Sequence, residues 1–128
     1  MPMKATWNLF FVAIALFALG GCALDSVKGV FQNKGQPELS AGISSYEDGK
    51  YGEASRSLQS ALDSGLGSAD QLTAHKYLAF IHCASGREKQ CRDEFGKALD
   101  INPTLELEPG EAGHPMWGPV FRSVKARR

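Results

Sequence analysis

The chain lacks the patterns that usually mark an enzyme or a metal protein. Its 128 residues include only three cysteines and three histidines, with no Cys-x-x-Cys pair and no two histidines four residues apart. No nucleophile elbow, phosphate-binding loop or dinucleotide fingerprint occurs. Asp93 and Glu94 are adjacent on a predicted helix, where neighbouring side chains point apart, so they make a poor acid–base pair. We therefore expect a protein that is not an enzyme and that binds no metal.

An excess of charge of either sign is also lacking. The chain has 14 basic and 14 acidic side chains. Removing residues 1–21 would remove one charged residue, Lys4, and would leave a net charge near −1. This balance gives no electrostatic case for nucleic acid as a partner. The basic end, Lys125–Arg128, is short and predicts a solvated tail, with weak contact to anionic lipid or peptidoglycan as the alternative.

No N-terminal apolar run is long enough to cross a membrane. The stretch Leu9–Leu19 carries no polar side chain, but crossing about 30 Å of hydrocarbon takes about 20 residues. Lys4 precedes this run, and Gly20 and Gly21 follow it directly before Cys22. A charged start, a short apolar stretch and a small-residue cleavage site are typical of a secretory signal.

The segment Leu19–Cys22 resembles the lipobox of bacterial lipoproteins, in which the cysteine receives lipid. The resemblance implies a signal peptide of residues 1–21 and a lipid-anchored Cys22, since two or more acyl chains such as palmitate hold a protein stably. In this family an aspartate directly after the cysteine retains the protein in the inner membrane. Ala23 stands there instead, which favours the outer membrane, on its periplasmic face. An ordinary secretory signal with an incidental cysteine is the alternative; apart from the lipid, no cofactor is expected.

The remaining cysteines, Cys83 and Cys91, are eight residues apart. In an oxidising compartment such a pair is more often a disulfide than a reactive site. Closing so short a loop stabilises a domain by roughly 2–3 kcal/mol in the chain-entropy account. Free buried thiols are the alternative.

The rest of the chain predicts an all-α fold. Residues 22–37 contain two glycines, a proline and no sustained period, which is typical of a tether. From Glu38 onward, apolar residues recur at helical spacing and are interrupted by glycine-containing turns. The pattern predicts four helices within residues 38–103: one from Glu38 to a turn at Asp48–Lys50, one from Tyr51 to Ser64, one capped by Ser68 or Asp70 and ended by Ser85–Gly86, and one from about Arg87 to Ile101, before Pro103.

These helices form two copies of one unit, offset by 37 residues. Gly49–Leu62 aligns with Gly86–Leu99, and the alignment places glycine, small and large apolar residues at matching positions. Gly42 likewise aligns with Ala79, where a small residue lets paired helices approach. The pattern resembles the tetratricopeptide repeat, a helical hairpin of about 34 residues. The resemblance implies two such hairpins; unrelated helical hairpins are the alternative.

Two repeats cannot bury their own faces, so residues 104–128 are predicted to cover the second one. Pro119 suits the first turn of a short helix, and Trp117 and Phe121 would supply most of the apolar area. A docking site for a partner is the alternative use of these two residues. The stretch Glu111–Phe121 looks like the ending of small bacterial tetratricopeptide lipoproteins associated with type VI secretion gene clusters.

In stacked hairpins of this family, the first helix of each unit lines a concave groove. The resemblance implies that this groove binds a protein partner, although packing on the chain's own tail is the alternative. His82 falls in an aromatic position of the repeat and predicts a packed histidine with its hydrogen bonds satisfied. The resulting hypothesis is a lipid-anchored adaptor that serves as an accessory of a type VI secretion system. The alternative is a self-associating assembly factor of an outer-membrane or pilus complex. The predicted groove residues are Leu39, Ile43, Tyr46, Lys76 and Phe80.

Overall fold

The computed structural model describes residues 33–128. The predicted signal peptide and the predicted lipidation site, Cys22, lie outside the described residues. The described part contains six helices and no strand, which confirms the all-α prediction. None of these helices is long and apolar enough to cross a membrane. In chain order they are α3 (Gln36–Glu47), α4 (Tyr51–Ser64), α5 (Ser68–Ala84), α6 (Glu88–Ile101), α7 (Pro109–Ala112) and α8 (Gly118–Ala126).

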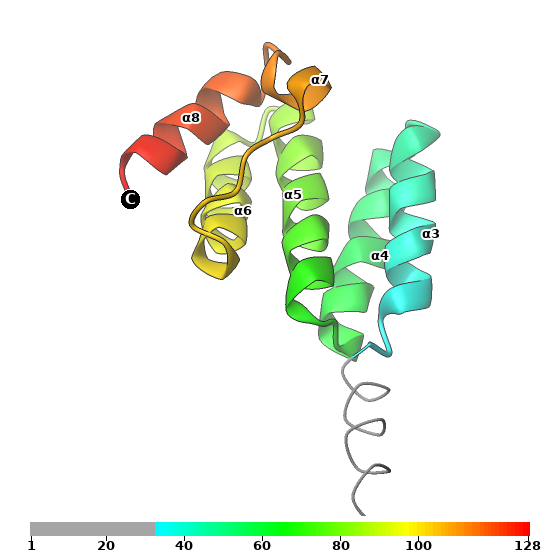
Figure 1. The fold of residues 1–128 in the computed structure, drawn as a ribbon. Helices are drawn as coiled ribbons and strands as arrows, with labels where there is room; N and C mark the ends of the chain where they lie inside the picture. Colours follow the sequence, from blue (N-terminus) through cyan, green and yellow to red (C-terminus); the bar gives the residue numbers. More distant parts are fainter. Residues whose placement is uncertain (1–32) are drawn as a thin grey trace, which may run out of the picture. The chain divides into compact units, whose positions relative to one another are not determined.

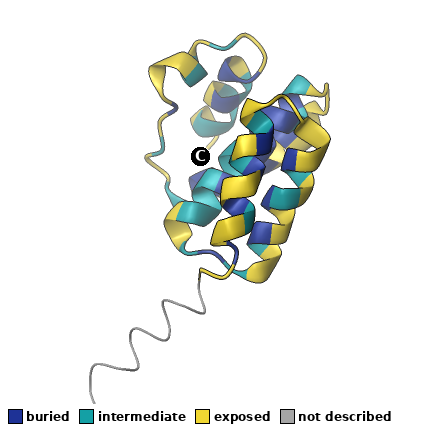
Figure 2. Cartoon of the chain, turned by 90° about the vertical axis from the view of Figure 1, so that its right-hand side faces the viewer, coloured by how far each residue is buried: buried dark blue, intermediate teal, exposed yellow. Residues whose placement is uncertain are grey.

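The four long helices pack as two neighbouring pairs (Figure 1). Helix α3 packs against α4, and α5 packs against α6, while α5 also contacts both helices of the first pair. Buried positions face the inside of these pairs, and exposed positions lie on the outside (Figure 2). The core has two parts. The first-pair core is Leu39, Ala54, Leu58, Ala61, Leu66, Ala74, Leu78 and Ile81; the second-pair core is Ala79, Phe80, Cys83, Cys91, Phe95, Leu99, Leu107, Trp117 and Phe121.

The turns inside the two pairs have the same conformation. Gly49 and Gly86, 37 residues apart, both adopt a φ of 74°, a region that glycine enters without steric cost. In each turn the N–H after the glycine donates to a carbonyl five residues back, Lys50 to Ser45 and Arg87 to His82, both at 2.8 Å. This is the glycine-terminated helix end known as the Schellman motif. The repeat read from the sequence is therefore matched by a repeated turn, while its assignment to the tetratricopeptide family stays a prediction.

Close approach within the first pair depends on Gly42. A Cβ at this position would lie 2.8 Å from Cγ of Leu58 and 3.1 Å from its backbone nitrogen. Real Cβ atoms do not come that near, so only glycine allows α3 to lie this close to α4. Small residues at this register were predicted from the alignment of Gly42 with Ala79, which is itself fully buried.

The end of the predicted tether belongs to the folded domain. Helix α3 begins at Gln36, two residues before the predicted start at Glu38. Gly35 donates its N–H to the carbonyl of Gly65 at 2.9 Å, and the Asn33 side chain accepts from the N–H of Gly67 at 2.9 Å. The prediction of a tether reaching to residue 37 was therefore wrong for residues 33–37. Proline at the start of α3 explains the earlier helix start, because its fixed φ suits the first turn.

The predicted N-caps of α5 were also wrong. The helix begins at Ser68 with Gly67 as its N-cap, and no side chain caps it. Gln71 instead ties this turn to the preceding loop, since its amide donates to the carbonyl of Leu66 at 2.7 Å.

Residues 104–128 lie over the second pair. Helix α8 packs against α6, and Phe121 on its inner side is buried in the second-pair core. The proline of α8 lies in its first turn, as predicted. Helix α7 was not predicted from the sequence. It is a single turn held by a reciprocal cap, in which Glu108 and Glu111 each accept a hydrogen bond from the other's backbone N–H.

Candidate functional site

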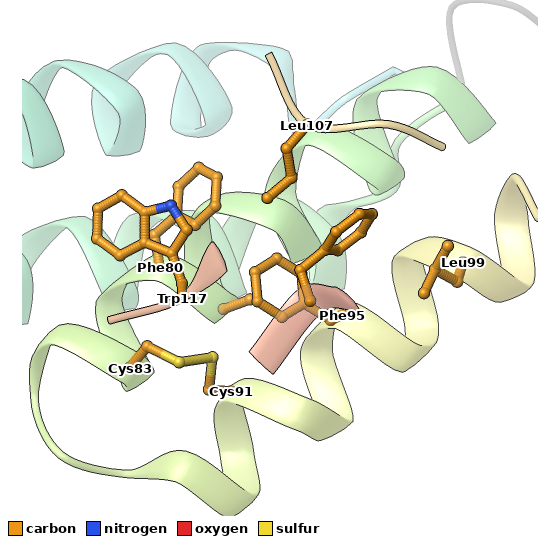
Figure 3. Packing of buried hydrophobic residues seen from close by; sticks show 9 residues of the cluster. Phe80, Cys83, Cys91, Phe95, Leu99, Leu107 and Trp117 are labelled. Atoms are coloured by element: carbon orange, nitrogen blue, oxygen red, sulfur yellow. A yellow bond between two sulfur atoms is a disulfide. The ribbon is translucent and has the colours of Figure 1, made fainter. Parts of the chain in front are cut away.

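Trp117 closes the second pair by stacking on Phe80. The two ring centroids are 4.6 Å apart with planes 28° apart, and Figure 3 shows the indole lying beside the Phe80 ring. His114 stacks on Trp117 with centroids 3.3 Å apart, and the indole N–H donates to the carbonyl of Glu111 at 3.0 Å. Phe80 is only 1% exposed and Trp117 7%. Trp117 and Phe121 therefore both lie in the second-pair core.

Lys76 is also engaged by the chain's own C-terminal segment. Its Nζ lies 2.8 Å and 3.1 Å from the two carboxylate oxygens of Glu111, and both side chains are largely buried. The same ammonium lies 5.7 Å from the Tyr77 centroid and 5.8 Å from that of Phe80, within cation–π range. In this structure Lys76 and Phe80 do not form an open surface for a partner.

The three groove residues of α3 all pack in or against the first-pair core, and they differ in how far they are buried. Leu39 lies in the first-pair core, and Ile43 packs against that core. Tyr46 alone bridges to the second pair, with its ring centroid 6.3 Å from that of Phe80. The predicted five-residue groove is thus not one accessible surface. The chain's own tail covers Lys76 and Phe80, whereas Leu39 and Ile43 pack within the first pair. The physical reason is that two hairpins leave an apolar face, and residues 104–128 are the nearest apolar chain available to cover it.

Three tyrosines remain partly accessible beside this covered region, and we call them the tyrosine face: Tyr46, Tyr51 and Tyr77. The Tyr46 ring lies 5.5 Å from Tyr51, stacked, and 5.0 Å from Tyr77, edge-on. Tyr51 is 37% exposed, one of the two large apolar side chains classed as exposed in the described part. Sequence reasoning missed Tyr51 and Tyr77 as surface residues, although Tyr51 follows the first repeated turn directly.

Acidic side chains surround the tyrosine face. Burial raises the pKa of Tyr46 to about 12, and the neighbouring phenols and Glu111 add to this effect. Burial likewise raises the pKa of Tyr77, with further contributions from Glu111, Glu47 and Glu108. The phenols of Tyr46 and Tyr77 are therefore neutral at physiological pH, and the face offers aromatic rings and phenolic donors near glutamates.

A partly buried ionic cluster joins α5 to α6 on another side. His75 Nδ1 lies 2.6 Å from one carboxylate oxygen of Glu94, and Lys97 Nζ lies 2.8 Å from the other. Burial by itself would raise the pKa of Glu94, but the hydrogen bonds from His75 and Lys97 lower it overall. Within residues 33–128, Glu94 bonds only His75 and Lys97 through its side chain, so we interpret the cluster as a structural link between the two helices. As expected, Asp93 points elsewhere and pairs with Lys89.

His82 differs from its prediction. Its Nδ1 is buried and has no hydrogen-bond partner, so the expected satisfied histidine was wrong in this respect. Burial lowers the pKa of His82, and the nearby Arg87 adds to this effect. A neutral ring packs at this position at lower cost than a charged one.

Cys83 and Cys91 form a disulfide, with their Cα atoms 5.2 Å apart. Both residues are buried in the second-pair core (Figure 3). The bond links the end of α5 to the start of α6 across the repeated turn. It therefore fixes the hairpin on which the C-terminal segment packs.

Residues 33–128 contain no group of three or more His, Cys, Asp or Glu side chains arranged to hold a metal ion. Compared with known proteins, the chain matches no family model, no curated protein and no solved structure.

Proposed function

We propose that the protein is an adaptor anchored by lipid on Cys22 to the outer membrane, which holds a protein partner on the periplasmic side. The observation that carries this proposal is the tyrosine face. Partly exposed, mutually packed tyrosines are the side chains that most often supply binding energy at protein interfaces. Lipid anchoring would confine this small face to a membrane surface and raise its effective concentration beside other envelope proteins.

The tyrosine face is a different surface from the groove that the tetratricopeptide resemblance implied. Tyr46 is the one predicted groove residue that also belongs to the tyrosine face. Glu111 is already paired with Lys76, but Glu47 and Glu108 also act on Tyr77. They favour a partner segment that carries lysine or arginine, because such cations pair with both carboxylates and aromatic rings. A type VI secretion apparatus remains the favoured setting, from the resemblance of residues 111–121.

Site-specific photo-crosslinking in cells tests this function. A photoreactive phenylalanine placed at Tyr51 in the full-length lipoprotein should give a discrete adduct with one envelope protein. The matched control places the same group at Gln90, which is exposed on α6, and should not give that adduct. Equal adducts from both positions, or none from Tyr51, would remove the tyrosine face as the binding site.

The anchor is tested separately by Cys22→Ser. This variant should move the protein from the membrane fraction to the soluble periplasmic fraction, because no acyl group could be attached. Continued membrane association of the variant would contradict the lipoprotein assignment, whatever the crosslinking result.

Self-association is the second candidate, and opposite charges at two surfaces favour it. An open cleft of about 690 Å³ between α6 and α8 is lined by Arg92, Lys97, Arg127 and Arg128, together with Asp93 and Asp100. It could receive the acidic edge of the tyrosine face of another copy. Three of these cations already pair within the chain, Arg92 with Glu88, Lys97 with Glu94 and Arg128 with Asp100. That pairing weakens the case, and sedimentation at increasing concentration and at low and high salt would decide it.

A further inference from the structure

A second cavity lies within the C-terminal segment, apart from the tyrosine face. It has a volume of about 360 Å³ and opens between the irregular stretch before α7 and helix α8. This volume falls at the lower end of the range for small-molecule pockets, about 300–1,000 Å³. Every residue that lines it comes from residues 106–126, so the cap itself carries the pocket.

The floor of the pocket is apolar. Leu107 and Phe121 line it, and both are buried members of the second-pair core. Ala112 and Gly118 add backbone and little side chain. A Cβ at Gly118 would lie 2.4 Å from the carbonyl oxygen of Ala112, so the glycine allows α8 to start directly against α7.

The rim carries a guanidinium that no carboxylate in the described part of the chain neutralises. Arg122 donates from Nη1 to the carbonyl of Ala112 at 3.2 Å, and within residues 33–128 it makes no ion pair with Asp or Glu. Its remaining N–H groups can form the bidentate pair that guanidinium makes with a carboxylate. The second rim cation, Lys125, already contacts Glu106 and donates to the carbonyl of Leu105 at 2.8 Å. Within residues 33–128, Arg122 is the one charged group of the three on the rim that has no ion-pair partner.

We propose that this pocket binds a carboxylate attached to an apolar group, with the apolar part on Leu107 and Phe121 and the carboxylate on Arg122. One unpaired cation suits a single negative charge. A phosphate, which carries a second charge and a stronger hydration shell, would gain little from the apolar floor. The C-terminal residue of a peptide and a medium-length fatty acid both offer this chemistry.

The pocket is tested by NMR titration of the full lipidated chain in lipid nanodiscs. The probes are octanoate and the tripeptide acetyl-Ala-Ala-Leu with a free C-terminus, each compared with its uncharged amide. We expect shifts of the amide signals of Gly118 and Phe121 with an acid, and no saturable shifts with its amide. Saturation by the peptide acid alone, by octanoate alone or by both supports the pocket and distinguishes the sources. No saturable shift with either acid, or equal binding of an acid and its amide, would overturn the proposal.

Variants connect the binding to Arg122. Arg122→Gln should weaken the binding of the acid about 10- to 100-fold, the usual effect of losing a charged hydrogen-bonded pair. Arg127→Gln, at the end of the same helix but outside the pocket, should leave it unchanged. Ala126→Leu places a larger side chain in the pocket lining and should reduce binding without changing charge. Equal weakening by Arg122→Gln and Arg127→Gln would reduce the effect to general electrostatic attraction and refute the site.

Discussion

Replacing Trp117 with alanine should remove a large part of the stability of this domain. The indole is nearly buried, stacks on Phe80 at 4.6 Å and on His114 at 3.3 Å, and donates to a backbone carbonyl. Truncating a buried tryptophan to alanine typically costs about 3–5 kcal/mol. Small domains have a total free energy of unfolding of about 5–15 kcal/mol, so this loss would lie between about a fifth and the whole of the total.

The assay is urea unfolding of the mature chain, followed by circular dichroism of its helices. The midpoint should fall while the slope stays near that of the wild type, because the rest of the core still unfolds as one unit. The thermal midpoint should fall by more than about 10 °C, at about 4–8 °C per kcal/mol for a domain of this size. Met116→Ala is the matched control, because the side chain of Met116, next to Trp117 in the sequence, is 46% exposed. This substitution should change the free energy of unfolding by less than about 0.5 kcal/mol.

The reasoning would be refuted by a loss below about 1 kcal/mol in Trp117→Ala. Residues 104–128 would then not be a cap in solution. A loss of similar size in Met116→Ala would instead show that residues 104–128 are sensitive to any substitution. Burial of Trp117 would then not explain its effect.

Three further changes test other parts of the structure. Gly42→Ala should destabilise by about 1–3 kcal/mol in urea unfolding, because its methyl group would lie 2.8 Å from the Leu58 side chain on α4. Gly52→Ala is the control: its methyl group would meet only Nη1 of Arg56, at an ordinary 3.9 Å, so it should be neutral or stabilising by up to about 1 kcal/mol. Equal effects of the two substitutions would contradict the close approach. Replacing Cys83 and Cys91 together by alanine should cost roughly 2–3 kcal/mol, read from the thermal midpoint, and reduction of the wild type should give a similar loss. The pKa of Glu94 is lowered on folding, so the ionised carboxylate stabilises the folded state at pH values above the ordinary glutamate pKa, and this stabilisation is lost as the pH falls through the lowered pKa. Glu94→Gln should therefore lower the free energy of unfolding at pH 7 and flatten the acid side of its pH dependence. An unchanged pH dependence would contradict the proposed role of the cluster.

The four long helices could be predicted because their signals are local. Apolar spacing and the glycines at positions 49 and 86 set helix ends within two residues of those observed. Helix α7 could not be predicted in the same way, since one turn has no periodicity and its cap uses two glutamates in place of the usual serine or threonine. The start of α3 was missed because the proline at position 37 was interpreted as a tether residue.

The candidate site was less predictable because its contacts join distant parts of the chain. An apolar Phe80 and a cationic Lys76 have the same sequence pattern whether a partner or the chain's own tail covers them. The choice depends on Trp117 and Glu111, which lie more than 30 residues later, and no local rule connects them to α5. The pairing of Cys83 with Cys91 was within reach of sequence reasoning, since both ends lie beside one short turn.

The strength of the cap also argues for where a partner would bind. A partner that entered the predicted groove would first have to displace Trp117 and separate Lys76 from Glu111. If displacement costs about 3–5 kcal/mol, as the tryptophan substitution would measure, it weakens the apparent affinity by about 10²- to 10³·⁵-fold. Binding at the tyrosine face avoids that cost, because Tyr51 and the neighbouring rings are accessible while the cap stays in place. Trp117→Ala therefore separates the two routes: it should leave binding at the tyrosine face intact wherever the domain remains folded, and it should strengthen binding in the groove.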